Sequence, residues 1–66
     1  MSTILEIREV ATIFKLPIRS VSALAKRGEL QGFKVSNRWR FRAEDVEEFI
    51  ERKINESQTR HIVKAT

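Results

Sequence analysis

The sequence predicts a small α+β domain in which two short helices precede a two-stranded hairpin and a last helix. Apolar residues recur with the helical period near the N-terminus and again after residue 43. Between these segments, residues 32–42 (GFKVSNRWRFR) alternate apolar and cationic side chains, as one strand following another does. With 66 residues the chain forms one domain, and a chain this short buries only about 60% of its unfolded surface.

The first two helices are expected over residues 6–14 and 17–27. Each has an apolar stripe at helical spacing: Ile7, Val10, Ala11 and Phe14 in the first, and Ile18, Val21, Leu24 and Ala25 in the second. Pro17 ends the first helix, because the residue before a proline avoids the α region, and proline suits the first turn of the next helix. Gly28 ends the second helix. Two short helices joined by a short turn form a helix-turn-helix unit.

The hairpin of residues 33–42, called the wing below, is expected to have one apolar and one cationic face. Its apolar residues all have odd numbers, namely Phe33, Val35, Trp39 and Phe41. If these four share the buried face, Val35 faces Trp39, and the loop has three residues (Ser36, Asn37 and Arg38) unless a bulge intervenes. The parity of Trp39 favours packing in the core over stacking on a base.

The last helix is expected from residue 43 to about residue 56. Val46, Phe49, Ile50 and Ile54 follow the helical period, and acidic residues crowd the first turns, where they complement the helix dipole. Residues 57–66 show no apolar stripe, so we expect a flexible tail there. The predicted organisation is a domain over residues 1–56 followed by this tail.

The charge is concentrated in the middle of the chain. Residues 15–42 carry eight Lys or Arg and one Glu, whereas residues 43–56 carry six acidic and two basic residues. A cationic block beside an acidic segment attracts a polyanion in one orientation.

Catalysis is not expected from this composition. The chain has no cysteine, its one histidine (His61) lies in the expected tail, and no glycine-rich phosphate-binding loop is present. We therefore expect no enzyme activity, cofactor or metal site. The absence of an apolar run of 18 residues or of a signal peptide predicts a soluble cytoplasmic protein without a membrane partner, associated with the nucleoid if it binds DNA.

Double-stranded DNA is the polyanion that the cationic block fits best. On the second helix, the residues away from the apolar stripe are Arg19, Ser20, Ser22, Ala23, Lys26 and Arg27. Arg19 and the serines have the chemistry to read base edges, and Lys26 and Arg27 suit phosphates. In the wing, the candidate DNA contacts are Lys34, Asn37, Arg38, Arg40 and Arg42. A merely solvated basic helix face is the alternative for the second helix.

The run KRGELQGFKVSNRWRFRAEDVEEFI resembles the MerR-like winged helix-turn-helix domain of the excisionase type, and the whole resemblance covers residues 5–50. The resemblance implies that residues 17–27 read the major groove and that Asn37, Arg38 and Arg40 contact the backbone or minor groove. It also implies an excisionase (recombination directionality factor) of a phage or mobile element. Such factors are not catalytic; they bind sites cooperatively, head to tail, bend DNA, and help a tyrosine or serine integrase to excise it.

Some positions depart from the family pattern. Pro17 replaces a Ser or Thr helix cap, and Lys15 stands where the turn usually has glycine. Ser22 and Ala23 replace larger residues, so the base preference of relatives does not carry over.

Three functions stay open at this level. The short chain, without an effector domain after residue 56, favours the excisionase. The alternatives are a small transcription regulator of the same fold and a protein-interaction adaptor that uses the acidic last helix.

Overall fold

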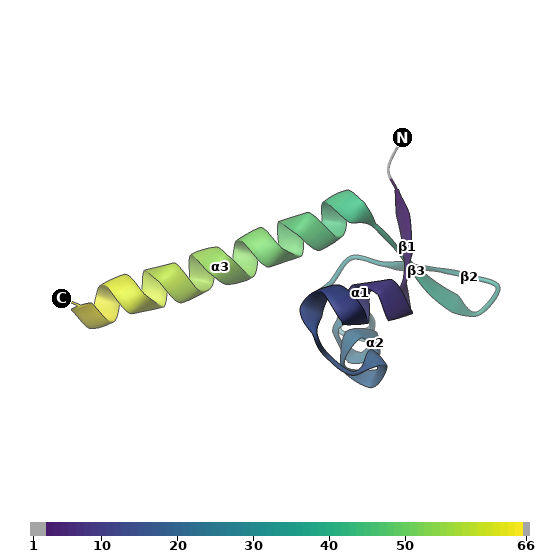
Figure 1. The fold of residues 1–66 in the computed structure, drawn as a ribbon, viewed down its shortest axis with the longest axis horizontal. Helices are drawn as coiled ribbons and strands as arrows, with labels where there is room; N and C mark the ends of the chain where they lie inside the picture. The colour runs from purple at the N-terminus through teal and green to yellow at the C-terminus, as the bar shows by residue number, and fades with distance from the viewer. Residues whose placement is uncertain (1–2, 66) are drawn as a thin grey trace.

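The protein folds as two short helices, a three-stranded antiparallel sheet and a long last helix. The computed structural model describes the backbone of residues 3–65 and the side chains of residues 3–58. The elements in chain order are β1 (Ile4–Glu6), α1 (Ile7–Phe14), α2 (Ile18–Lys26), β2 (Phe33–Val35), β3 (Arg38–Arg42) and α3 (Ala43–Ala65). Figure 1 shows α1 and α2 together on one side of the sheet, with α3 running away from both. The predicted α+β fold, with its helix-turn-helix, wing and last helix, is confirmed.

The core is small and draws on every part of the domain. Phe41 of β3 is fully buried and belongs to a core cluster that includes residues from α1, α2, α3 and the loop before β2. The buried residues are Val10, Ala11, Val21, Ala25, Leu30, Phe41, Val46 and Phe49. The helical stripes predicted from the sequence therefore supply most of the core.

The strand β1 was not predicted. It pairs antiparallel with β3, so that Leu5 faces Phe41 and Glu6 faces Arg40. The carbonyl of Thr3 also accepts a hydrogen bond of 2.9 Å from the N–H of Ala43. Three residues are too few to show strand alternation, which explains the omission. Because the sheet order is β1-β3-β2, this short strand makes β3 central.

The turn between α1 and α2 depends on Lys15 rather than on Pro17. Lys15 adopts a left-handed conformation (φ 57°), and the N–H of Leu16 donates to the carbonyl of Ala11 at 3.0 Å. Together with the bond from the N–H of Lys15 to the carbonyl of Thr12, this forms a Schellman motif. The first helix thus ends before Pro17, which instead precedes α2 and accepts the N–H of Ser20.

The register of the wing differs from the prediction. Ser36 and Asn37 both have positive φ (52° and 64°), as in the two-residue turn that suits a twisted hairpin. Val35 therefore pairs with Arg38, and Lys34 with Trp39. The predicted three-residue loop is wrong, because both turn residues adopt the left-handed conformation and no third loop residue is needed.

Because the register differs by one residue from the prediction, each side chain of β2 lies on the opposite face of the sheet from the one predicted. Phe33 (41% exposed) and Val35 (50% exposed) do not lie in the core as predicted, but on the face that carries Arg38 and Arg40. Lys34 instead lies on the inner face, where its Nζ is 5.3 Å from the ring centroid of Trp39. Core space is the physical reason, because the stacked rings of Trp39 and Phe41 already cover the inner face.

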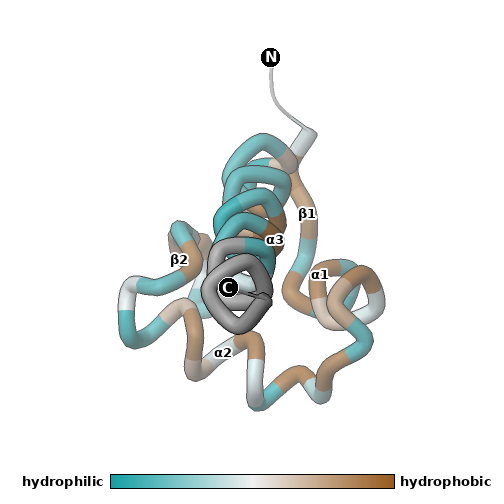
Figure 2. The backbone as a smooth tube through the Cα atoms, turned by 90° about the vertical axis from the view of Figure 1, so that its left-hand side faces the viewer, coloured by the Kyte–Doolittle hydropathy of each residue, from teal (hydrophilic) through white to brown (hydrophobic). Residues whose placement is uncertain are grey.

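The helix α3 is longer than predicted. Its packed part ends near Phe49 and Ile50, residues 51–58 are exposed, and the helix continues to Ala65 instead of ending near residue 56. Figure 2 colours most of its exposed turns as hydrophilic. The flexibility expected for residues 57–66 stays a prediction, and the side chains of residues 59–66 lie outside the described residues. Neither α3 nor any shorter helix in the described part has an apolar stretch that could span a bilayer.

The left-handed Lys15 predicts that Lys15→Gly stabilises the fold. Glycine adopts positive φ without the steric cost of a Cβ, so the free energy of unfolding should rise by about 0.5–1 kcal/mol. Urea denaturation followed by Trp39 fluorescence measures the change. Lys26→Gly, at an ordinary helical position, is the matched control and should lower stability instead. A loss of stability in Lys15→Gly would contradict this account of the turn.

The glycine before β2 gives a second prediction. A Cβ on Gly32 would lie 2.6 Å from Cε2 of the buried Phe41 ring, so Gly32→Ala should destabilise the domain by about 1–3 kcal/mol. Adding Phe41→Leu should recover part of that loss, because leucine leaves space at the ring edge. A double-mutant cycle measured by urea denaturation reports this coupling. Strictly additive losses would show that the two side chains do not compete for space.

Candidate nucleic-acid interface

The second helix presents its predicted DNA-contact residues in two groups. Val21 and Ala25 are buried and turn one side of α2 to the core. Arg19, Lys26 and Arg27 are exposed, whereas the small residues are only partly exposed: Ser20, Ser22 and Ala23. The helix therefore has long cationic side chains at both ends and only short side chains between them. Such a surface allows close approach of a groove wall.

A groove of about 430 Å³ lies between the start of α2 and the wing. It brings Ser22 of α2 together with Asn37, Arg38 and Arg40 of the wing. Arg19, Ser20, Ala23 and Lys26 do not line it. The groove joins the two segments that the sequence singled out separately, so a single ligand can contact both.

Five further residues line the groove that were not predicted as site residues, although Trp39 had been considered and assigned to the core: Glu6, Ile7, Arg8, Ile18 and Trp39. Arg8 is the chemically important addition, because it brings a third guanidinium to the groove and its side chain is 76% exposed. Its Nη2 lies 3.4 Å from Oε1 of Glu6. The sequence signal for Arg8 was weak, since it precedes the cationic block and lies far along the chain from the wing. The pairing of β1 with β3 brings the start of α1 to the wing.

Two of the predicted DNA-contact arginines are held by carboxylates. Arg27 donates through Nε to Oε2 of Glu29 at 2.7 Å, and this hydrogen bond lowers the pKa of the Glu29 carboxyl. Arg42 donates to both carboxylate oxygens of Asp45, at 2.7 and 3.0 Å, which raises the pKa of the Arg42 guanidinium. Exposed pairs of this kind contribute little to stability, but they lower the positive field that a ligand meets.

The other predicted cations have no carboxylate partner among the described residues: Arg19, Lys26, Lys34, Arg38 and Arg40. Arg40 donates to the carbonyl of Trp39 at 3.1 Å, which fixes its side chain along β3 without neutralising it. Arg38 and Arg40 thus combine full charge with a place in the groove. Lys34 keeps its charge, but it lies on the face opposite to them, contrary to the prediction that all four wing cations share one face.

The role predicted for Trp39 is confirmed in its main point. Its ring packs against the core and stacks on Phe41, with 6.1 Å between the ring centroids. Trp39 is only partly buried, however, and also lines the groove. It is therefore a core residue whose fluorescence can report on a ligand in the groove.

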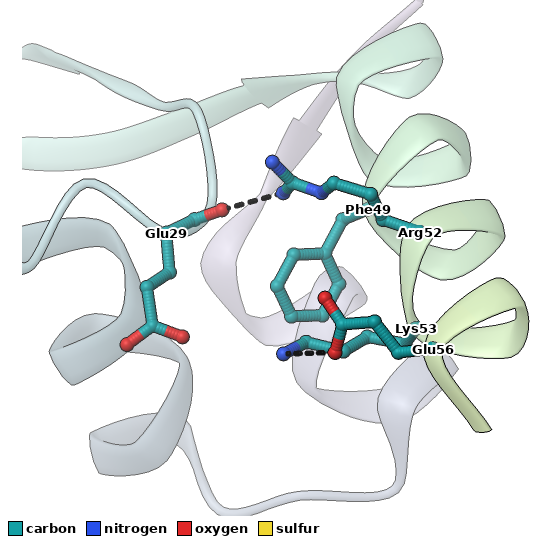
Figure 3. Close-up of a pocket in the computed structure, with 5 residues that line it drawn as sticks. All are labelled: Glu29, Phe49, Arg52, Lys53 and Glu56. Carbon is teal, nitrogen blue, oxygen red and sulfur yellow. Dashed lines mark hydrogen bonds and ion pairs between the residues drawn. The ribbon is translucent and has the colours of Figure 1, made fainter. Parts of the chain in front are cut away.

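A separate small cleft of about 160 Å³ lies between the loop after α2 and α3 (Figure 3). Arg52 spans it and donates from Nη2 to the carbonyl of Glu29 at 2.8 Å. The side chains of Arg52 and Lys53 lie over the Phe49 ring, 5.6 and 5.5 Å from its centroid. These contacts fix the start of α3 against the end of the helix-turn-helix, so the cleft has a structural explanation.

No group of histidine and acidic side chains in the described part of the chain is arranged to hold a metal ion. The side chains that line the groove offer hydrogen bonding and positive charge, together with the apolar surfaces of Ile7, Ile18 and Trp39. These are the properties of a surface that binds nucleic acid phosphate and base edges.

Comparison with known proteins agrees with this reading of the fold. The family model described as "Helix-turn-helix domain" matches residues 4–54, from the start of β1 to Ile54 of α3. No curated protein and no solved structure matches the chain. Since the match covers well over half of the sequence, the chain belongs to the helix-turn-helix domain family.

Proposed function

We propose that this helix-turn-helix DNA-binding protein is an excisionase-like factor that bends or coats DNA at attachment sites and directs an integrase toward excision. The observation that carries the DNA-binding part is the groove in which Ser22 of α2 meets Arg38 and Arg40 of the wing. The excisionase part rests on the sequence resemblance over residues 5–50.

The proposal assigns α2 to the major groove. In helix-turn-helix proteins the second helix lies there, with residues near its start against base edges. Arg19 has the reach to donate two hydrogen bonds to guanine, while Ser20, Ser22 and Ala23 are short enough to let the helix approach. Lys26, at the other end of α2, suits a phosphate.

The wing is assigned to the backbone and minor groove. Asn37 lies at the turn, and Arg38 and Arg40 extend from it along β3. Arg27 and Arg42 can join the interface only by exchanging Glu29 or Asp45 for a phosphate. Lys34, on the inner face, has to reach around the edge strand β2 to contact DNA.

The resemblance also supplies the proposed partners. A tyrosine or serine integrase would bind the protein–DNA complex, and neighbouring copies would associate head to tail on DNA, where the nucleoid is the site of action. A small transcription regulator of the same fold would use the same groove. The observation that favours an adaptor instead is the projecting, acidic α3, on which Glu47, Glu48 and Glu51 are exposed.

The DNA-binding proposal predicts a steep salt dependence. Among the described residues, Lys26, Arg38 and Arg40 are the cations without carboxylate partners that are assigned to phosphates, so the slope of log K against log salt should be about −2.7, because each neutralised phosphate contributes about −0.9. Titration of short duplexes against Trp39 fluorescence at several salt concentrations measures the slope. No binding even at low salt would reject DNA as the ligand and leave the adaptor.

Variants of single arginines separate the two parts of the interface. Arg38→Ala and Arg40→Ala should weaken binding to all sequences alike, each reducing the slope by about 1. Arg19→Ala should instead reduce discrimination between sites. Lys53→Ala, on α3 and outside the groove, is the matched control and should leave both properties unchanged. Equal loss in all four variants would show that charge alone, without the groove, determines binding.

The excisionase role predicts an effect on recombination rather than on transcription. The assay uses a plasmid that carries the attachment sites of a co-resident integrase. Co-expression of this protein should raise excision by at least about tenfold. This factor corresponds to a change of about 1.4 kcal/mol in the free energy of forming the excisive complex. The Arg38→Ala/Arg40→Ala double variant is the control and should not stimulate excision. Unchanged excision together with an altered output of a neighbouring promoter would favour the transcription regulator.

A further inference from the structure

The outer face of the sheet combines arginines with exposed apolar side chains. Alternation along the strands places on this face the residues that point away from the buried Phe41 and the partly buried Trp39. Its members are Ile4 and Glu6 of β1, Arg38, Arg40 and Arg42 of β3, and Phe33 and Val35 of β2. Glu6 is the one carboxylate among them, and Arg8 contacts it. The face is therefore cationic along its centre and apolar along the β2 edge.

The apolar residues of β2 lie directly beside the two groove arginines. Phe33 pairs with Arg40 and Val35 with Arg38, and directly opposite side chains in an antiparallel pair have Cβ atoms only about 5 Å apart. Phe33 and Val35 are 41% and 50% exposed, and Val35 immediately precedes the turn. A duplex that contacts Arg38 and Arg40 would therefore also meet these two side chains.

We infer that Phe33 and Val35 form an apolar wedge that enters the DNA minor groove beside Arg38 and Arg40 and bends the duplex. The inference rests on the proposed function, because it requires that the wing contacts DNA. Charge complementarity indicates DNA as the ligand of this face. The arginines beside the apolar strand have no carboxylate partner among the described residues and attract phosphates, and the apolar side chains suit the deoxyribose walls of the minor groove. The wing, and not only α2, then determines which sequences are bound.

The shape of the minor groove fits this assignment. It is about 6 Å wide, so it admits side chains of a narrow ribbon but no helix. Apolar side chains inserted there partly unstack a base step and kink the duplex toward the major groove. Pyrimidine–purine steps such as TA yield most easily, whereas A-tracts are stiff. The wedge therefore predicts a preference for a flexible step at a position where no base is hydrogen bonded.

The test uses two duplexes of about 30 base pairs, one with a central TA step and one with an uninterrupted A-tract at its centre. Dyes at the two ends report the bend by energy transfer. The wedge is removed in Phe33→Thr/Val35→Thr, which places threonine, a residue that favours strands, at both positions. The matched control is Ile13→Thr/Ile54→Thr, which removes apolar side chains of similar exposure (50% and 45%) from α1 and α3.

The wild-type protein should bend the TA duplex and bind it several-fold more tightly than the A-tract duplex. The wedge variant should lose both the bend and the preference, and should bind the TA duplex about tenfold more weakly, as expected for loss of buried apolar surface. Its salt slope should not change, because every cation remains. The control variant should behave as the wild type.

Three results would overturn the inference. The first is a wedge variant that bends and binds the TA duplex as the wild type does. The second is a loss of self-association by the wedge variant in sedimentation without DNA, with bending intact, which would assign the face to a second copy of the chain. The third is failure of the wild type to bind either duplex at low salt, which would reject the proposed function itself.

Folding of the variants is checked by thermal melting. If the double variant does not fold, Val35→Thr alone decides the matter, because threonine has nearly the shape of valine. It should reduce the bend of the TA duplex, and an unchanged bend would contradict the wedge.

Discussion

The burial of Phe41 in a strand that is paired on both edges is the constraint on which the rest of this structure depends. β3 lies between β1 and β2, and the ring of Phe41 is fully buried beneath it. Leu5 and Gly32 meet that ring from the two neighbouring segments, so the strand cannot rotate about its axis. With Phe41 held inward, alternation turns Arg40 and Arg42 outward. The position of the cationic surface thus follows from one apolar side chain.

The same strand sets the orientation of the last helix. β3 passes directly into α3, and the Thr3 carbonyl accepts the first N–H of that helix. Arg52 and Phe49 then fix α3 against the loop after α2. Beyond these contacts the helix has no core to cover, which explains why its later side chains up to residue 58 are exposed. The later turns of α3 are therefore stabilised by helix propensity rather than by packing.

Sequence reasoning succeeded where periodicity was long and failed where a single residue decided the geometry. The stripes of α1, α2 and early α3 each span two turns or more, so they predict helices and core residues well. The register of the wing was missed because parity was applied on the premise that every apolar residue is buried. The left-handed conformations of Ser36 and Asn37 reverse that outcome for β2.

The groove could be predicted only in part for a related reason. Arg38, Arg40 and Ser22 have the charge or size that DNA contact requires, whereas Arg8 and Ile18 join them only through tertiary structure. The residue types can be read from the sequence, but which of them lie next to one another depends on the pairing of β1 with β3. The strand β1 has no recognisable sequence pattern.

Two acidic residues, Glu29 and Asp45, define the interface as much as the basic residues do. Asp45 stabilises the start of α3 through the helix dipole and also holds Arg42, while Glu29 holds Arg27 at the end of α2. Both pairs lie at the borders of the cationic surface, whereas Arg38 and Arg40 at its centre have no carboxylate partner among the described residues. A phosphate placed at the centre gains the full attraction, but one placed at a border must first displace a carboxylate. The charge pattern therefore selects how a duplex is oriented on the domain before any base is read.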